Sequence, residues 1–321
     1  LLVSANLTYY WQPRPRLFSY ALFTLLIALL TWCFSGWQGT WHLRRQPRCG
    51  VRAQLPGSRM IWLWLAPLIF IVWANAHGGF VAGLCVFTAY LAVRGLEVAW
   101  VGGKRAIRLV ASWVILVTVC YGVTLINPYG WKLHAWLWRS LGEPRPEIVE
   151  WHGLAWGHEG FLPLVALIGL TLLGLWRSRR TLDATHTLLL ALTRWQSLAH
   201  HRFVPFFAIL VGLWMPAHWK SLFVTSERAS APTPRWMFAG VIAANLALAC
   251  LLADRLSDLK VDVADYPVSA IHYMAEQELG GRLVVTYNWA QYALAALGAP
   301  DGGRPPLVVA FDGRFRTCYP Q

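Results

Sequence analysis

The apolar run IWLWLAPLIFIVWANAHGGFVAGLCVFTAYLAV occupies residues 61–93 and is interrupted once, by NAHGG at 75–79. A helix that crosses a membrane needs about 20 apolar residues, each of which adds about 1.5 Å. The run is therefore too long for one upright crossing. An Asn, a His and two glycines at its centre predict two helices, 61–74 and 79–93, joined by a tight turn in which glycine supplies backbone freedom.

The same pattern recurs along the chain. A second long apolar run, 186–217, is broken by HHR at 200–202, which splits it into 186–199 and 203–217. Residues 131–141, WKLHAWLWRSL, are rich in Trp with basic edges and predict a helix lying in the membrane interface. Shorter uninterrupted runs predict single spans at 17–35, 107–126, 160–176 and 236–253.

The composition supports a membrane protein. The chain is 57% hydrophobic and only 13% charged, whereas soluble domains carry about 25% charged residues. Its net charge of +13 does not indicate a nucleic-acid partner, because the Lys and Arg residues fall in short clusters between apolar runs. The six cysteines show no CxxC spacing, so neither a zinc ribbon nor a disulfide framework is indicated.

The basic clusters predict the topology. With an external N-terminus and about eight crossings, the clusters within 44–59, 94–108, 177–180 and 220–235 all face the cytoplasm. The opposite side then collects NAHGG, NPYG at 127–130, an acidic loop and HHR. The sequence therefore predicts an all-α polytopic protein of the plasma (inner) membrane over 1–253, with some short or broken helices and an extracytoplasmic site.

The chain becomes polar after Asp254. A strand at 283–286, a helix at 288–297 and a strand at 307–311 predict a small extracytoplasmic α/β domain over 254–321. Asp312 and Arg314 follow the second strand, where α/β sheets bind ligands, although a simple Asp-Gly turn is the alternative. The chain begins at Leu1 and ends in FDGRFRTCYPQ, so we expect a fragment of a longer protein with a truncated tail domain.

Five polar residues on the predicted outer side are candidates for chemistry. Asn75 and His77 lie at membrane depth, where polar groups are costly and often functional, although both could simply cap helix ends. Glu147 and Glu150, in EPRPEIVEWHG, suit a general base or the binding of a divalent metal ion. A solvated acidic loop is the alternative. Arg202 suits a phosphate group through its guanidinium fork, and the alternative is an arginine reaching to the interface.

Several motifs together resemble a known family. WANAHGGFVAGL, LINPYGWKL, the acidic loop ending in IVEW, and HHRFVPFFAI resemble an uncharacterised bacterial family of multi-span proteins. That family is similar to the GT-C superfamily of membrane glycosyltransferases, which includes protein O-mannosyltransferases and aminoarabinose transferases. TYNWAQYALAAL, followed by a strand and DGR, is similar in layout to the start of the external domain of the oligosaccharyltransferase catalytic subunit, but lacks the acid of its WDYG-like element.

The resemblance implies sugar transfer from a polyprenyl-phosphate donor to an acceptor at the outer face of the membrane. It implies that Arg202, with His200 and His201, holds the lipid phosphate, and that Trp289 and Tyr292 contact substrate. Asn75 and His77 would orient sugar or phosphate oxygens, and the principal catalytic carboxylate of such enzymes would precede Leu1. Alternatives are a transporter or flippase of lipid-linked glycans, or a non-catalytic membrane assembly subunit.

Overall fold

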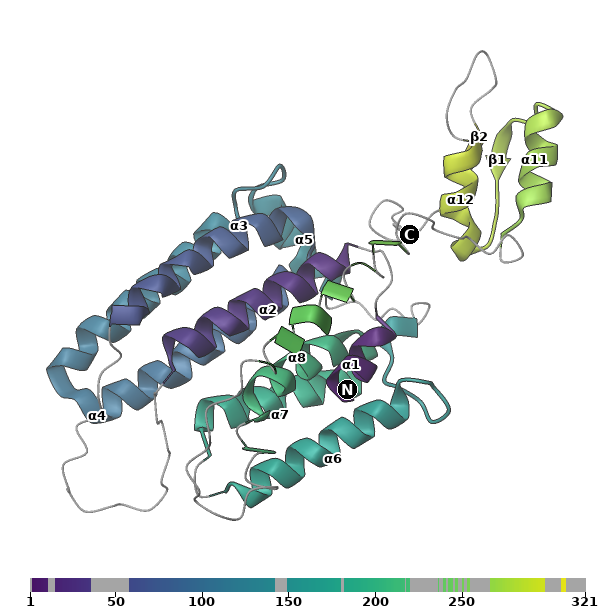
Figure 1. The fold of residues 1–321 in the computed structure, drawn as a ribbon. Coiled ribbons are helices and arrows are strands. Elements are labelled where there is room, and N and C mark those ends of the chain that lie inside the picture. The colour runs from purple at the N-terminus through teal and green to yellow at the C-terminus, as the bar shows by residue number, and fades with distance from the viewer. Residues whose placement is uncertain are drawn as a thin grey trace. The chain divides into compact units, whose positions relative to one another are not determined.

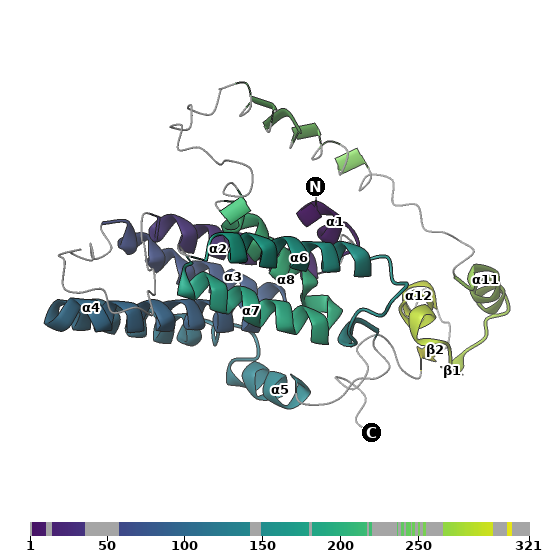
Figure 2. The same cartoon turned by 90° about the horizontal axis from the view of Figure 1, so that it is seen from below.

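The computed structural model describes residues 2–10, 15–35, 58–141, 149–179, 182–216, 218–219, 266–297 and 307–309, with parts of 236–254. The chain divides into two units, Leu1–Arg228 and Ala229–Gln321, each of which is described by itself. The described chain is almost entirely helical, with one two-stranded sheet in the second unit (Figure 1, Figure 2).

The first unit is a group of apolar helices. Arg16–Cys33, Arg59–Ala76 and Phe80–Ala99 are long and apolar enough to cross a membrane, and Ile107–Val123, Phe161–Arg177 and His201–Trp214 are shorter apolar helices. This confirms that the chain has the helices of a membrane protein. Its elements are α1 (Leu2–Thr8), α2 (Arg16–Cys33), η1 (Ser58–Leu65), α3 (Ala66–Ala76), α4 (Phe80–Val123), α5 (Trp131–Leu141), η2 (Val149–Trp151), α6 (Phe161–Arg177), α7 (Ala184–Ala199), η3 (His201–Phe203) and α8 (Val204–Trp214).

Both predicted breaks are confirmed. Helix α3 ends at Ala76 and α4 begins at Phe80, while α7 ends at Ala199 and α8 begins at Val204. The role predicted for the glycines was wrong, because Gly79 has φ −62° and ψ −9°, an ordinary right-handed conformation. Gly79 supplies space instead: a Cβ there would collide with Ser19 Oγ and lie 2.9 Å from His77 Nδ1.

Helix α4 spans 44 residues but doubles back on itself. Thr88 Oγ1 lies 3.4 Å from Tyr121 Oη, a residue 33 positions away, whereas a straight helix would separate them by about 50 Å. A Cβ on Gly95 would lie 3.6 Å from Val110 Cγ1. The two predicted spans 79–93 and 107–126 are therefore the antiparallel arms of α4, although helix continues where a loop was expected.

The N-terminal segment differs from the prediction. Residues 1–16 were expected to be extracytoplasmic, with no helix or strand assigned to them, and Leu2–Thr8 forms α1. Its Leu2, Val3 and Leu7 pack against the buried core of the unit. The side chain of Asn6 donates from Nδ2 to the carbonyl of Pro163, at the start of α6, over 2.9 Å. A segment with too few apolar residues for a span thus becomes helical where neighbouring helices partly bury it.

The turns of the first unit gather at two ends. At one end, which we call the pocket end, Asn75 Nδ2 donates to the carbonyl of Ile126 over 2.8 Å, so the α3–α4 turn lies beside the chain that leaves α4. The opposite end contains Cys33, whose Sγ lies 3.4 Å from the carbonyl of Arg59. Helices α2 and α3 run side by side between these ends (Figure 1).

A buried charge cluster closes the opposite end. Arg94 is 1% exposed, and its guanidinium pairs with Glu97 over 2.9 Å and with Asp183 over 2.6 Å. Thr185 Oγ1 donates to the second oxygen of Glu97 over 3.3 Å. Two carboxylates therefore surround one arginine, and the cluster fastens α4 to the start of α7.

The second unit contains α11 (Val268–Glu276), β1 (Gly281–Leu283), α12 (Tyr287–Leu297) and β2 (Leu307–Val309). The strands pair in parallel, with Gly281 opposite Leu307, and α12 connects them. Ile271, Ala290, Ala293 and Val309 form a small core. A strand was predicted at 283–286. The observed strand β1 begins and ends earlier, because residues 281–283 are the ones that pair with β2.

Candidate functional site

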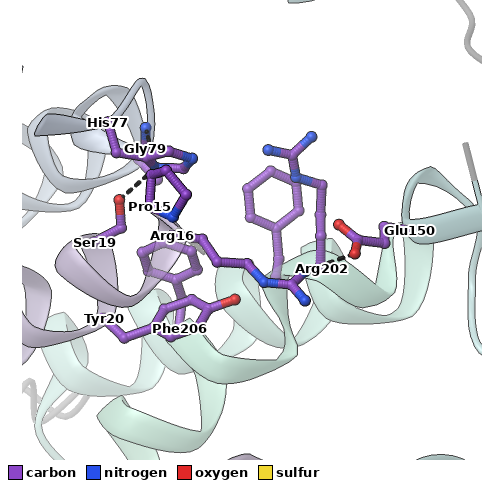
Figure 3. A pocket seen from close by; sticks show the side chains of 11 residues that line it. Pro15, Arg16, Ser19, Tyr20, His77, Gly79, Glu150, Arg202 and Phe206 are labelled. Atoms are coloured by element: carbon purple, nitrogen blue, oxygen red, sulfur yellow. Dashed lines mark hydrogen bonds and ion pairs between the residues drawn. The ribbon is translucent and has the colours of Figure 1, made fainter. Parts of the chain in front are cut away.

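One pocket of about 260 Å³ lies at the pocket end of the first unit (Figure 3). It is bounded by the start of α2, the α3–α4 turn, η2 and η3, which are four segments far apart in sequence. The lining residues are Pro15, Arg16, Ser19, Tyr20, His77, Gly79, Ala82, Glu150, Arg202, Phe203 and Phe206.

The charged side of the pocket carries two arginines and one carboxylate. Arg16 Nη1 lies 2.6 Å from Glu150 Oε1, and these side chains are 12% and 31% exposed. Figure 3 shows Arg16 extending towards Glu150, with the pair marked by a dashed line. The guanidinium carbon of Arg202 lies 4.5 Å from the centroid of the Trp151 ring. Two guanidiniums on one side of a pocket suit an anion, and a guanidinium fork matches the oxygens of a phosphate.

His77 is held on the other side of the pocket by three neighbours. Its Nδ1 lies 2.7 Å from Ser19 Oγ, and the backbone N–H of Gly79 donates to the same nitrogen over 3.1 Å. Ser19 Oγ in turn accepts a hydrogen bond from Trp73 Nε1 over 2.8 Å. Burial lowers the pKa of His77 below its ordinary value of 6.5, and the charges of Arg202 and Arg16 lower it further. His77 is therefore neutral at physiological pH.

Aromatic residues form the remaining wall. The rings of Tyr20 and Phe206 contact each other edge to face, with centroids 5.8 Å apart. Phe203 lies beside them, 6.1 Å from Phe206 between ring centroids. A pocket with cationic and aromatic sides is suited to a ligand with an anionic group attached to an apolar or sugar-like body.

Three predicted site residues lie in this pocket, namely His77, Glu150 and Arg202. Asn75 does not. Its side-chain amide donates to the carbonyl of Ile71 over 2.9 Å and to that of Ile126 over 2.8 Å. These bonds agree with the alternative, in which Asn75 satisfies backbone groups where helices end, and a contact between Asn75 and substrate stays a prediction.

His200 and His201 also lie outside the pocket lining. His200 Nδ1 hydrogen bonds to the carbonyl of Trp151, and the backbone N–H of His201 donates to the carbonyl of His152 over 2.9 Å. The His201 side chain is 2% exposed, and its Nδ1 lies 3.3 Å from Tyr10 Oη. These bonds fasten η2, which carries Glu150, to η3, which carries Arg202, and a contact of either histidine with a ligand stays a prediction.

The other predicted site residues belong to different parts of the chain. Trp289 and Tyr292 lie on α12 of the second unit, where the Tyr292 ring is 5.3 Å from that of Tyr266. Glu147, Asp312 and Arg314 lie outside the described residues. Within the described ranges, no group of three or more His, Cys, Asp or Glu side chains could hold a metal ion.

The sequence analysis missed Arg16 and Ser19. Arg14 and Arg16 flank the outer end of the first predicted span, on the side whose loops are otherwise acidic. This exception to the positive-inside pattern was the available signal for Arg16. Ser19 has no comparable signal, because its importance depends on Trp73 and His77, which reach it only in the folded chain.

Comparison with known proteins does not assign the chain to a family. No protein-family model, curated protein or solved structure matches the chain. The resemblance to GT-C glycosyltransferases stays a prediction, and the pocket itself supplies the basis for assigning a function.

Proposed function

We propose that the chain is a membrane glycosyltransferase-like protein whose pocket binds the phosphate group of a polyprenyl-phosphate sugar. One observation carries the proposal: Arg16 and Arg202 line a single pocket with only one carboxylate, Glu150, among its lining residues. Hydrogen bonds between guanidinium and phosphate are among the strongest that proteins make. The aromatic wall of Tyr20 and Phe206 suits the sugar or the first isoprene units of such a donor.

In this proposal the pocket faces the outer side of the plasma membrane. Arg59 and Arg94, which belong to the basic clusters expected in the cytoplasm, lie at the opposite end of the unit. About eight crossings, some of them short, would then place residues 254–321 outside the cell. The pocket would lie near the depth of lipid headgroups, where the phosphate of a polyprenyl lipid is found.

The proposed reaction transfers the sugar to an acceptor hydroxyl. The acceptor oxygen forms a bond to the anomeric carbon, and the bond from that carbon to the phosphate oxygen breaks. The lipid phosphate leaves with the electron pair, and Arg16 and Arg202 stabilise its negative charge. Glu150 takes the proton of the acceptor hydroxyl, and Glu147 is the second carboxylate of the same loop that suits this role.

Binding of farnesyl phosphate to the purified protein in detergent tests the phosphate site. We expect Arg202→Ala to weaken binding by about 10- to 100-fold, the loss of about 1.5–3 kcal/mol typical of a hydrogen bond to a charged group. Arg202→Lys should retain part of the affinity, because an ammonium cannot reproduce the guanidinium fork.

Arg179→Ala is the matched control for this experiment. Arg179 also stacks on a tryptophan, Trp176, over 5.9 Å, but it does not line the pocket. Its loss should leave the affinity unchanged. Equal affinities in the wild type, Arg202→Ala and Arg179→Ala would refute the phosphate site.

Glu150→Gln separates catalysis from binding. The variant should still bind farnesyl phosphate, and more tightly than the wild type, because a carboxylate that repels the phosphate has been removed. Transfer of labelled sugar from a polyprenyl-phosphate sugar should be lost. Unchanged transfer would remove Glu150 as the base, and binding without any transfer by the wild type would indicate a non-catalytic subunit.

A further inference from the structure

The hydrogen bonds of His77 define which of its ring nitrogens carries the proton. The backbone N–H of Gly79 is directed at Nδ1 over 3.1 Å. A backbone N–H can only donate, so Nδ1 must accept and cannot itself be protonated. The proton of the neutral ring therefore lies on Nε2.

Ser19 and Trp73 reinforce this tautomer. Trp73 Nε1 can only donate, and it donates to Ser19 Oγ over 2.8 Å. The Ser19 hydroxyl is then oriented to donate its own hydrogen to His77 Nδ1, 2.7 Å away. Protonating Nδ1 would disrupt the bond from Gly79 and reverse the bond from Ser19. Within the described residues Nε2 makes no hydrogen bond, while the His77 ring lines the pocket.

A second histidine, His158, shows that the hydrogen bond from a glycine N–H to Nδ1 is a feature of the local turn. Gly160 N–H donates to His158 Nδ1 over 3.0 Å, just before α6 begins, as Gly79 does before α4. A His followed two residues later by Gly thus forms the same turn at two helix starts. The turn alone explains the tautomer but not a site. Only His77 adds the bond from Ser19 and a place in the pocket beside Arg16 and Arg202.

We propose that His77 is a fixed, neutral hydrogen-bond donor, whose Nε2–H binds an oxygen of the phosphate group held by Arg16 and Arg202. Ser19 and Trp73 act as positioning residues that fix the tautomer. This inference rests on the proposed function, and it sharpens the expectation that His77 orients sugar or phosphate oxygens, since it excludes His77 as a general base. A base needs an available lone pair, and the only lone pair of this ring already accepts from Gly79 and Ser19.

The surroundings of His77 agree with a neutral donor. The titratable groups that line the pocket with it are Arg16 and Tyr20 on α2, Arg202 on η3 and Glu150 on η2. The two arginines and burial all lower the pKa of His77. A neutral N–H can bind a phosphate oxygen without adding a third positive charge beside two guanidiniums, so the ring remains a donor across the physiological pH range.

Nitrogen-15 NMR of the histidine-labelled protein tests the tautomer independently of any ligand. The His77 signals are identified by their loss in His77→Leu. We expect an unprotonated Nδ1 and a protonated Nε2 for His77 and also for His158. In Ser19→Ala, the His77 signals alone should move towards a mixture of tautomers. A protonated Nδ1 on His77 in the wild type would overturn the inference.

Titration with farnesyl phosphate tests the donor role. The Nε2 signal of His77 should shift, while the signals of His158 stay in place. Inorganic phosphate, titrated in parallel, should produce the same shift at higher concentration if the headgroup is recognised by itself. A shift with farnesyl phosphate only would assign recognition to the lipid form. No shift of His77 with either ligand would contradict the donor role.

Affinity measurements with matched variants complete the test. His77→Gln keeps a side-chain N–H donor and should bind farnesyl phosphate within about threefold of the wild type, whereas His77→Leu should lose about tenfold. His158→Leu should bind like the wild type, and unchanged thermal unfolding shows that His77→Leu is folded. If Arg202→Ala weakens binding but His77→Leu does not, the phosphate site survives and the His77 donor is excluded. If the wild type does not bind farnesyl phosphate at all, both the phosphate site and the His77 donor are overturned.

Discussion

The two ends of the first unit use similar residues in opposite proportions. At the opposite end one arginine, Arg94, is surrounded by Glu97 and Asp183 and is 1% exposed. At the pocket end two arginines and one carboxylate line a cavity, and the Arg16–Glu150 pair remains partly open, at 12% and 31% exposed. Among the described residues, carboxylates therefore outnumber the arginine in the closed cluster, and arginines outnumber the carboxylate beside the cavity.

This difference separates charges enclosed in a buried cluster from charges that line a cavity. A buried charge surrounded by partners is costly to disrupt, although it adds little compared with an apolar core. A partly neutralised group of charges in a pocket has capacity for an additional counter-ion. Arginine by itself therefore does not indicate a binding site; the ratio of arginines to carboxylates and the adjoining cavity do.

Substitution at the closed end should have the largest effect on folding. Arg94→Met leaves the buried Glu97 and the half-buried Asp183 without this arginine, which should cost about 3–5 kcal/mol of the free energy of unfolding. Thermal unfolding in detergent and folded yield measure this loss. Arg179→Met, at an exposed arginine, is the control and should change neither. Comparable losses in the two variants would break the contrast between the ends.

In the turn at the pocket end, alanine should destabilise the fold at Gly79 and be tolerated at Gly78. A Cβ at Gly79 would collide with Ser19 Oγ, whereas one at Gly78 would lie 3.6 Å from Leu137 Cδ2, an ordinary contact. Gly79→Ala should therefore cost about 1–3 kcal/mol in unfolding free energy, the usual range for overpacking. Gly78→Ala should be nearly neutral, and the reverse order would show that the turn packs differently.

The open ion pair should contribute less to stability than the closed one. Arg16→Met should lower the free energy of unfolding by only about 1 kcal/mol, because the pair with Glu150 is partly solvated. The same substitution should weaken farnesyl phosphate binding about tenfold. A stability loss as large as that of Arg94→Met would mean that both ends are structural.

The smallest effect concerns pH. The pKa of His77 is lowered in the folded protein, whereas the unfolded chain has the ordinary value of 6.5. Below pH 6.5 the unfolded chain therefore binds a proton that the folded chain resists, so the unfolding free energy falls as pH decreases. His77→Gln should reduce this fall. Identical pH profiles of thermal unfolding for wild type and variant would remove His77 as a contributor.

The sequence predicted the fold best at positions where a polar residue interrupts an apolar run. Polar groups inside apolar runs predicted the breaks at 75–79 and 200–202, and α5 follows the predicted interfacial helix residue for residue. The continuation of helix through α4 was missed, because basic residues in a helix resemble those of a loop. Residues 2–8 were missed as a helix because a short segment owes its structure to α6 and α8.

The candidate site could be predicted only in part, for a related reason. His77, Glu150 and Arg202 are unusual where they occur in the sequence, and all three line the pocket. Asn75 is equally unusual, but it satisfies backbone carbonyls instead. Residue type shows that a polar group needs a partner; only the fold shows whether that partner is the chain itself.

The attachment of η2 to η3 has a consequence for how the pocket responds to its surroundings. Backbone hydrogen bonds and the stacking of Arg202 on Trp151 join Glu150 and Arg202 into one body. Arg16 instead belongs to α2, a helix long and apolar enough to cross a membrane. Because helices tilt to match bilayer thickness, a thinner or thicker membrane would move Arg16 relative to Arg202 and to Glu150, its partner in the ion pair. The lipid bilayer would thus tune the spacing of the two arginines in the pocket.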